Sequence, residues 1–267
     1  MARKSADINA MELSARKAAR KLLRDFNEVE HLQVSRKGPA DFVTQADLTC
    51  EATLREELSR LRPEYGFITE EGKNVPAKDG EHYWVIDPLD GTTNFLHGLP
   101  HFAISIAIKT GKEITAGVVL DPVKDEMFWA EKGSGAFVNT RRLRVSSRTR
   151  MADSIFATGI PFLGKKDHDK FLKELERFMA ISAGVRRYGA ASLDLCYVAA
   201  ARYDGYWERD LQEWDIAAGI IIAREAGALV TQIDGGEKML EKGDILASSP
   251  GVNSGMMEIF RELRMGR

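Results

Sequence analysis

An apolar, strand-like segment leads directly into two carboxylates that could act together on a phosphate ester. Asp87 and Asp90 are three residues apart, so both can face one point, and Pro88 fixes the direction of the chain between them. Gly91 allows the backbone to approach a ligand closely, and Thr92 would begin a helix whose free N–H groups suit a phosphate. Carboxylates beside an anion site require a bridging cation, and hard oxygen ligands favour Mg²⁺ or Mn²⁺ over zinc.

Acidic residues at two other places strengthen this interpretation. Asp90-Gly91 alone would most often be a hairpin turn. Glu70 and Glu71 follow a second short apolar segment, where they could also be two solvated acids in a loop. Asp215 opens an apolar helix, where it could also serve as an N-cap. Acids at the ends of three separate elements favour a shared metal site over unrelated turns and caps.

These motifs resemble, in type and order, the three-part metal signature of the inositol monophosphatase family, which belongs to a lithium-sensitive phosphatase superfamily. The three parts are Glu70-Glu71, residues 87–92 and Trp214-Asp215. The likeness extends over nearly the whole chain, because residues 39–47 resemble the N-terminal segment of that family and residues 187–191 and 204–208 resemble its substrate segments.

The resemblance implies two or three Mg²⁺ ions in the site, with Mn²⁺ as a possible substitute. Glu70, Asp87 and the Leu89 carbonyl would hold the first ion, and Asp87, Asp90 and Asp215 would hold the second. Glu70 would also help to hold a third, weaker one. Water would then attack the phosphorus in line, without a covalent intermediate.

The resemblance also assigns catalytic and substrate contacts. The N–H groups of Gly91 and Thr92 would bind phosphate, and Thr92, paired with Asp47, would help to deprotonate the attacking water. The alternative for Asp47 is that it only caps its helix. The residues expected to contact the substrate alcohol are Gly189, Ala190, Ala191 and Glu208, with Asp90 touching a ring hydroxyl.

The expected reaction is hydrolysis of a phosphate monoester on a small polyol, with myo-inositol 1-phosphate as the first choice. Histidinol phosphate, fructose bisphosphate and adenosine bisphosphate stay open as substrates. Four residues depart from the common family pattern in or near the pocket segments, and these are Thr69, Ala190, Arg202 and Asp210. A regulatory role in RNA processing or transcription is the alternative of a different class, and the arginine-rich run at 141–150 could also be a solvated connector.

The elements that must position these residues change character along the chain. Residues 5–26 have the apolar spacing of an amphipathic helix, and a second helix would begin at Thr44 with a capping-box sequence and end at Pro63. The segments that follow predict one mainly antiparallel sheet with strands at 65–68, 83–86, 102–108, 114–120, 126–130 and 136–138.

Strands and helices alternate in the second half. Strands are expected at 155–158, 185–188, 205–207, 229–232 and 245–247, and helices at 168–182, 190–203, 215–226 and 253–264. We therefore expect an N-terminal half, 1–146, with the sheet and most metal ligands, and a C-terminal half, 147–267, with Asp215 and the substrate contacts, as one structural unit. The resemblance implies an α/β fold with α-β-α-β-α layers.

Composition narrows the class of protein. The chain has 267 residues and 44% hydrophobic residues, and its net charge of −2 argues against a protein that binds nucleic acid over its whole surface. Cys50 and Cys196 predict two reduced, buried thiols in a cytoplasmic protein. We expect neither a membrane-spanning segment nor a secretory signal, because the longest apolar run is too short and the N-terminal segment has no apolar core. His97 and His101 are expected to be structural or surface histidines, and the resemblance implies a homodimer.

Overall fold

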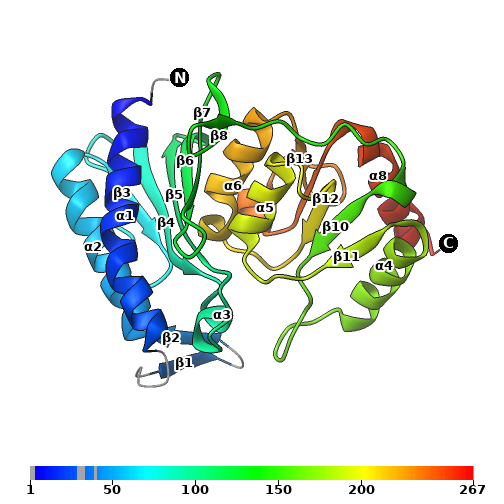
Figure 1. The fold of residues 1–267 in the computed structure, drawn as a ribbon, viewed down its shortest axis with the longest axis horizontal. Helices are drawn as coiled ribbons and strands as arrows, with labels where there is room; N and C mark the ends of the chain where they lie inside the picture. Colours follow the sequence, from blue (N-terminus) through cyan, green and yellow to red (C-terminus); the bar gives the residue numbers. More distant parts are fainter. Residues whose placement is uncertain (1–3, 29–33, 39–40, 267) are drawn as a thin grey trace.

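Two β-sheets alternate with three layers of helices (Figure 1). The computed structural model describes residues 4–28, 34–38 and 41–266, so Pro39 and Ala40 of the N-terminal motif lie outside the described residues. Helices α1 (Ala6–Asn27) and α2 (Gln45–Leu61) cover the outer face of the first sheet. Helices α5 (Ala191–Ala199) and α6 (Glu213–Glu225) lie between the sheets, and α4 (His168–Ile181) and α8 (Pro250–Arg264) cover the second sheet. The predicted α-β-α-β-α layering is confirmed.

The first sheet has seven strands in sequence order. Only β3 and β4 are parallel, and the remaining neighbours are antiparallel, as predicted. Its strands are β3 (Gly66–Thr69), β4 (His82–Asp90), β5 (Ala103–Thr110), β6 (Glu113–Asp121), β7 (Glu126–Glu131), β8 (Gly135–Val138) and β9 (Arg141–Arg142). Trp84 and Ile86 join the core under α1 and α2, whereas Val85 joins the core around α5 and α6. Both faces of this sheet are therefore covered.

Local signals set the ends of the two outer helices. Ser5 caps α1 by accepting a hydrogen bond from the Ile8 N–H. Thr44 and Asp47 form the predicted capping box at the start of α2, and the helix ends one residue before Arg62-Pro63. Cys50 lies buried in α2 and Cys196 in α5, both as free thiols.

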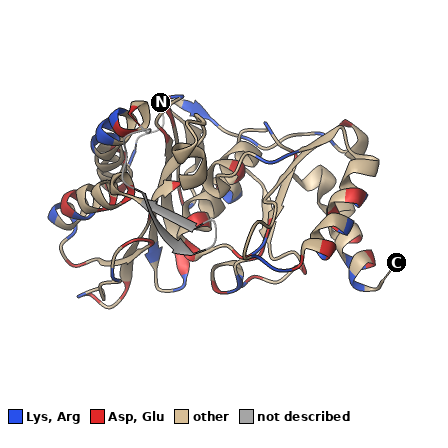
Figure 2. Cartoon of the chain, turned by 90° about the horizontal axis from the view of Figure 1, so that it is seen from below, with Lys and Arg blue, Asp and Glu red and all other residues tan. Residues whose placement is uncertain are grey.

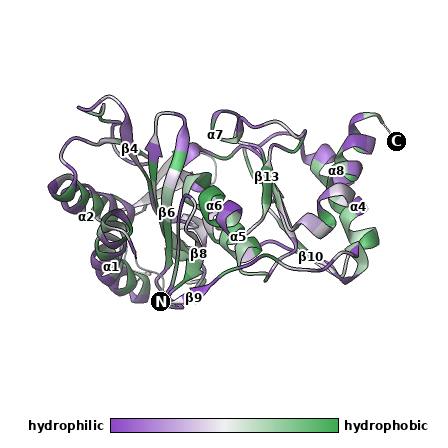
Figure 3. Cartoon of the chain, turned by 90° about the horizontal axis from the view of Figure 1, so that it is seen from above, coloured by the Kyte–Doolittle hydropathy of each residue, from purple (hydrophilic) through white to green (hydrophobic). Residues whose placement is uncertain are grey.

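Helices α5 and α6 form an apolar central layer (Figure 3). Glycines allow α6 to pack very closely on both sides: a Cβ at Gly219 would lie 2.5 Å from Leu195 of α5, and one at Gly117 of β6 would lie 2.9 Å from the Ala218 Cα. The predicted helix at 190–203 ends at Ala199, because the chain turns through a left-handed residue, Ala201.

The second sheet has the strand order β11-β10-β12-β14-β13. Its strands are β10 (Ile155–Thr158), β11 (Gly184–Arg186), β12 (Gly205–Glu208), β13 (Leu229–Thr231) and β14 (Ile245–Ser248). Helix α8 begins three residues earlier than predicted, because Pro250 suits the first helical turn. The helix expected to begin at Thr92 is α3 (Thr92–Leu96). The short elements β1 (Val34–Gly38), β2 (Asp41–Thr44), η2 (Met151–Asp153) and α7 (Met239–Lys242) were not predicted as separate elements.

The surface mixes charges of both signs. Basic and acidic positions alternate along the outer helices (Figure 2). Arg144, Arg148 and Arg150 are exposed on the extended connector that runs from β9 to η2. Within the described part of the chain, no helix combines the length and the apolar character that a bilayer span requires.

Candidate active site

Strand β4 carries Asp87 and Asp90 through a β-bulge. The expectation that the strand ends at Asp87 is wrong, because pairing continues to Asp90. Asp87 pairs with Ser105 and Asp90 with Ala103, so β4 has one more residue than β5 between these pairs. Pro88 has no N–H to donate to the sheet, and the Leu89 N–H turns to the Asp87 Oδ1 at 2.9 Å. The bulge brings both carboxylates to the end of a buried strand.

Asp90 binds the start of α5, which is about a hundred residues away in the sequence. Its carboxylate accepts hydrogen bonds from the Ala191 N–H at 3.2 Å and the Ser192 N–H at 2.8 Å, and from the Ser192 hydroxyl. Ala190, the N-cap residue of α5, has no side chain that can cap the helix. Asp90 therefore satisfies the free N–H groups of this helix in place of the usual cap.

Gly91 and Asn94 fix the segment at Tyr188–Ala190 against α3. Gly91 adopts a left-handed conformation with φ of 93°, and a Cβ there would lie 3.3 Å from the Gly189 carbonyl oxygen. The Asn94 side-chain amide donates to the Tyr188 carbonyl at 2.7 Å. The predicted substrate residues Gly189, Ala190 and Ala191 are thus brought beside Gly91 and Asp90.

Asp47 makes the contacts of a cap and also approaches Thr92. One of its oxygens, Oδ2, accepts from the Thr44 N–H at 2.8 Å and from the Thr44 hydroxyl. The other, Oδ1, lies 3.4 Å from the Thr92 hydroxyl, which also donates to the Leu89 carbonyl at 3.0 Å. Asp47 is completely buried. Asp47 therefore makes the contacts of a helix cap, and its second oxygen also faces the Thr92 hydroxyl.

The loop that carries Glu70 is held by a cluster that we call the α2 clasp, made of Glu51, Arg55 and Thr69. Glu51 accepts from the Glu71 N–H at 2.9 Å, from the Thr69 hydroxyl at 3.1 Å and from Arg55 at 2.8 Å. Arg55 also donates to the Lys73 carbonyl at 2.8 Å. Thr69, one of the departures from the family pattern, is therefore a structural link between α2 and this loop.

Asp215 lies in the first turn of α6, but it is not the N-cap. That position belongs to Gln212, whose N–H donates to the Asp215 Oδ2 at 2.7 Å. Asp215 therefore fixes the start of α6 from the third helical position.

The carboxylates of Asp87, Asp90 and Asp215 have pKa values that are raised by burial or by one another. Burial raises the pKa of Asp87 well above its usual range, and the charges of Glu70, Asp90 and Asp215 raise it further. Burial also raises the pKa of Asp90 to about 6 and that of Asp215 well above normal. Within the described part of the chain, no lysine or arginine forms an ion pair with Asp87, Asp90 or Asp215.

The donor set fits hard divalent cations. Carboxylate and carbonyl oxygens are the ligands that Mg²⁺ prefers, and a cation would offset the repulsion between the buried acids. Across the residues that the structure describes, however, no three Asp, Glu, His or Cys side chains are already arranged around one ion. Asp87, Asp90 and Asp215 each accept hydrogen bonds from nearby N–H or hydroxyl groups.

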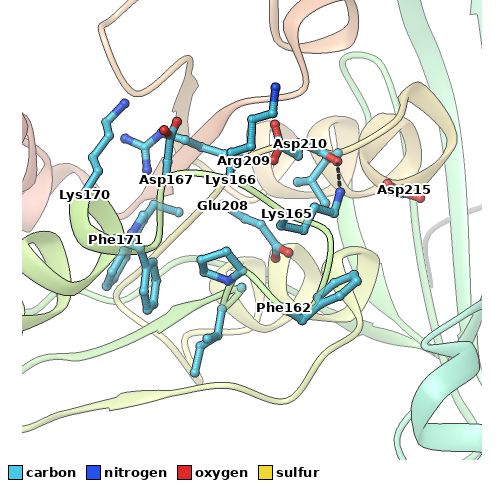
Figure 4. A pocket seen from close by; sticks show the side chains of 15 residues that line it. Phe162, Lys165, Lys166, Asp167, Lys170, Phe171, Glu208, Arg209, Asp210 and Asp215 are labelled. Atoms are coloured by element: carbon cyan, nitrogen blue, oxygen red, sulfur yellow. Dashed lines mark hydrogen bonds between the residues drawn. The ribbon is translucent and has the colours of Figure 1, made fainter. Parts of the chain in front are cut away.

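Glu208 lies at the end of β12 and lines a cavity of about 200 Å³ that also reaches Asp215 (Figure 4). The Tyr206 hydroxyl donates to its Oε2 at 2.6 Å. Asp210, another departure from the family pattern, lines the same cavity, and its carbonyl accepts from the Lys165 ammonium at 3.2 Å. The cavity begins beside the acidic site, which suits the alcohol part of a bound phosphate ester.

The remaining departure, Arg202, lies away from this cavity. It forms an ion pair with Glu126 and lies over the Tyr197 ring at 4.5 Å from the centroid. Arg202, Tyr197 and His101 line a separate cavity of about 790 Å³. His97 is exposed, whereas His101 is largely buried between Tyr188 and Tyr197 and lies outside the acidic site.

Four polar residues that position the site were not identified from the sequence: Glu51, Asn94, Ser192 and Tyr206. Asn94 lies two residues after the motif at 87–92, and Ser192 follows Ala191 directly, so both were close to identified residues. Glu51 and Tyr206 lie on regular elements, where their types alone carry no functional signal.

Comparison with known proteins gives consistent relatives over nearly the full length. The inositol monophosphatase family matches residues 4–264. An inositol-1-monophosphatase of Rhizobium meliloti is 52% identical over 258 residues, which cover 97% of each chain. The Nus factor SuhB of Vibrio cholerae is 42% identical over 255 residues and 96% of each chain. The crystal structure of the extragenic suppressor protein suhB from Bartonella henselae has a TM-score of 0.94 and 49% identity, covering 98% of this chain and all of that one.

Proposed function

We propose, from the premise that the chain belongs to the inositol monophosphatase family, that it is a phosphatase acting on a phosphate monoester of a small polyol. The first-choice substrate is myo-inositol 1-phosphate, with myo-inositol and phosphate as products. The observation that carries this proposal is the group of acids made of the buried Asp87 and Asp90 and the half-buried Asp215, which forms no ion pair with a lysine or arginine within the described residues. Such a group is costly to maintain unless cations occupy the site, and bound cations would in turn attract a phosphate.

The metal ligands follow the family pattern. Glu70, Asp87 and the Leu89 carbonyl would hold one Mg²⁺, and Asp87, Asp90 and Asp215 a second, with Glu70 contributing to a weaker third. Mn²⁺ is the expected substitute. Bound divalent cations supply Lewis-acid polarisation of the phosphate and lower the pKa of a water molecule.

The side chains and backbone of this chain orient the reaction. The Thr92 hydroxyl accepts the water proton while it donates toward Asp47, a role supported by the 3.4 Å separation of Thr92 Oγ1 and Asp47 Oδ1. The N–H groups of Gly91 and Thr92 bind the phosphate oxygens. Gly189, Ala190, Ala191 and Glu208 contact the alcohol, and Asp90 meets a ring hydroxyl.

Comparison of substrates tests this proposal. We expect the highest kcat/KM for myo-inositol 1-phosphate among this ester, histidinol phosphate, fructose 1,6-bisphosphate and adenosine 3′,5′-bisphosphate. Activity should require Mg²⁺ and be blocked by millimolar Li⁺. Full activity in excess chelator, or a clear preference for another ester in the panel, would contradict the proposal.

Assembly and location are further parts of the proposal. We propose a homodimer in the cytoplasm, and light scattering at working concentration should give twice the mass of one chain. A regulatory role with RNA is the second candidate, favoured by the exposed arginines at 144, 148 and 150 and by the similarity to the Nus factor of Vibrio cholerae. A salt-dependent shift of RNA at micromolar protein would support it, and absence of a shift at low salt would exclude it.

A further inference from the structure

The Glu208 carboxylate is held by a neighbour on its own strand. Tyr206 and Glu208 are two residues apart on β12, so both side chains lie on one face of the sheet. The Tyr206 side chain is completely buried, and its hydroxyl donates to the Glu208 Oε2 at 2.6 Å. A buried phenol hydroxyl needs an acceptor, so this hydrogen bond restrains both groups.

A glycine on the adjacent strand makes room for this carboxylate. Strand β10 pairs in parallel with β12, and Gly159 follows β10 directly. A Cβ at Gly159 would lie 1.8 Å from the Glu208 Oε1 and 2.4 Å from its Oε2. No side chain at 159 is compatible with the observed position of the carboxylate. Glu208 is therefore packed directly on the backbone of the neighbouring strand.

The held carboxylate faces the cavity that begins at Asp215. Figure 4 shows Glu208 among the residues that line this cavity, with Lys165 and Phe162 nearby. Burial raises the pKa of Glu208 above its usual range, and the Tyr206 hydrogen bond and the charges of Arg187 and Lys165 offset only part of this increase. The Tyr206 hydroxyl and the Gly159 backbone thus hold the carboxyl group of Glu208 in one position at the alcohol end of the site.

We propose that Tyr206 and Gly159 are positioning residues that determine specificity for polyhydroxylated alcohols by fixing the orientation of Glu208. This inference rests on the proposed function, in which Glu208 accepts hydrogen bonds from the substrate hydroxyl groups. A carboxylate that is already fixed loses little side-chain entropy when substrate binds. It forms good hydrogen bonds only with alcohols whose hydroxyl groups point toward its oxygens. A substrate whose alcohol part carries no further hydroxyl group gains no binding energy from this arrangement.

The test compares two phosphate esters in the complete enzyme with Mg²⁺. In Tyr206→Phe we expect KM for myo-inositol 1-phosphate to rise about tenfold with kcat within about twofold, the pattern of lost ground-state binding. The KM for p-nitrophenyl phosphate, whose alcohol has no further hydroxyl group, should not change. Gly159→Ala should show the same split. Glu208→Gln combined with Tyr206→Phe should lose little beyond Glu208→Gln alone, because the two residues act as a unit.

Tyr203→Phe is the matched control, because Tyr203 is also a buried tyrosine but its hydroxyl does not contact Glu208. Its kinetics on both esters should equal those of the wild type. An unchanged KM for the inositol ester in folded Tyr206→Phe, or an equal rise for both esters, would overturn the inference while leaving the proposed function intact. If Tyr206→Phe does not fold, Gly159→Ala decides by the same criteria. A wild-type enzyme that hydrolyses only p-nitrophenyl phosphate would instead overturn the proposed function together with this inference.

Discussion

The two carboxylate oxygens of Asp47 contact different groups, and only one of them is used to cap a helix. Its two oxygens separate the tasks, since Oδ2 meets Thr44 and Oδ1 points toward the Thr92 hydroxyl. Asparagine can keep the contact with the Thr44 N–H, but its amide group would then donate to Thr92 instead of accepting from it. The effects on stability and on catalysis can therefore be measured separately.

We predict that Asp47→Asn lowers kcat by about 10²-fold or more, while the free energy of unfolding falls by no more than about 1 kcal/mol. Thr92→Val should show a similar loss of kcat, and the double variant should lose little beyond either single one. Asp7→Asn is the control, because Asp7 is also in the first turn of an outer helix but far from the site in the chain. A fully active Asp47→Asn enzyme with a normal melting temperature would refute the catalytic role.

His101 provides a pH-dependent contribution to stability. Its ring packs beside Tyr188 and Tyr197, and its Nε2 is buried without a hydrogen-bond partner in the described structure. Burial, together with the charge of Lys124, lowers the pKa of His101 to about 4. Below its ordinary pKa of about 6.5 the unfolded chain takes up a proton that the folded chain resists, so stability should fall as pH decreases from about 6.5 to 4.

We predict that His101→Phe reduces this fall in stability by on the order of 1–2 kcal/mol, as measured by urea unfolding at pH 7 and pH 5. His97→Phe is the matched control, because His97 is exposed on the same loop. Identical pH dependence of unfolding in wild type and His101→Phe would show that another group is responsible.

At the scale of elements, the α2 clasp connects a helix of the outer layer to the loop after β3. Glu51 and Arg55 lie one turn apart on α2, and together they hold Thr69, the last residue of β3, and the N–H of Glu71. Glu70 lies between these two anchored residues. The orientation of this proposed metal ligand should therefore depend on side chains that do not touch the metal.

We predict that Thr69→Gly weakens Mg²⁺ binding about three- to tenfold, because the hydroxyl contact is lost and the backbone gains freedom. Calorimetric titration with Mg²⁺ measures this directly, and kcat at saturating Mg²⁺ should be unchanged. Thr110→Gly is the control, since Thr110 is likewise the last residue of a strand, β5. Equal Mg²⁺ affinity in Thr69→Gly and wild type would show that the clasp does not act on the metal site.

At the scale of the whole molecule, the acidic site lies where strands and helices of both halves of the chain meet. Asp87 and Asp90 come from the first sheet, Asp215 from the central layer and Glu208 from the second sheet. Because these acids repel one another, their proximity lowers the free energy of unfolding of the metal-free protein. Cations that bind only the folded state should raise it again.

We predict that Mg²⁺ at 100 times its dissociation constant stabilises the protein by about 2.7 kcal/mol, measured by unfolding with and without chelator. Asp87→Asn should be inactive, more stable than wild type in chelator and insensitive to Mg²⁺. Asp121→Asn is the control, and it should change stability in the opposite direction. Asp121 is also buried, at the end of β6, but it forms an ion pair with Lys124. Its replacement should therefore destabilise the protein with or without Mg²⁺. A destabilised Asp87→Asn protein in chelator would contradict this account of the site.

Several features of this protein could be predicted from the sequence because they depend on neighbours within a few residues. The capping box at Thr44 and Asp47, the end of α2 before Pro63 and the amphipathic α1 are of this kind. The order of the acidic motifs was sufficient to identify the family, and membership of the family predicted the layered fold. The bulge after Asp87 was missed, although Pro88 is the local reason for it.

The contacts that give the site its geometry were decided by the tertiary structure. Asp90 meets the start of α5 more than a hundred residues away, Glu51 reaches the loop after β3, and Gly159 lies against Glu208 because β10 and β12 are parallel neighbours. The spacing of residues in the sequence does not predict these contacts, because each depends on the order of strands in a sheet and on the distance between packed layers. Residue types and local order therefore determined which chemistry is available, and the packing of the layers determined which atoms can perform it.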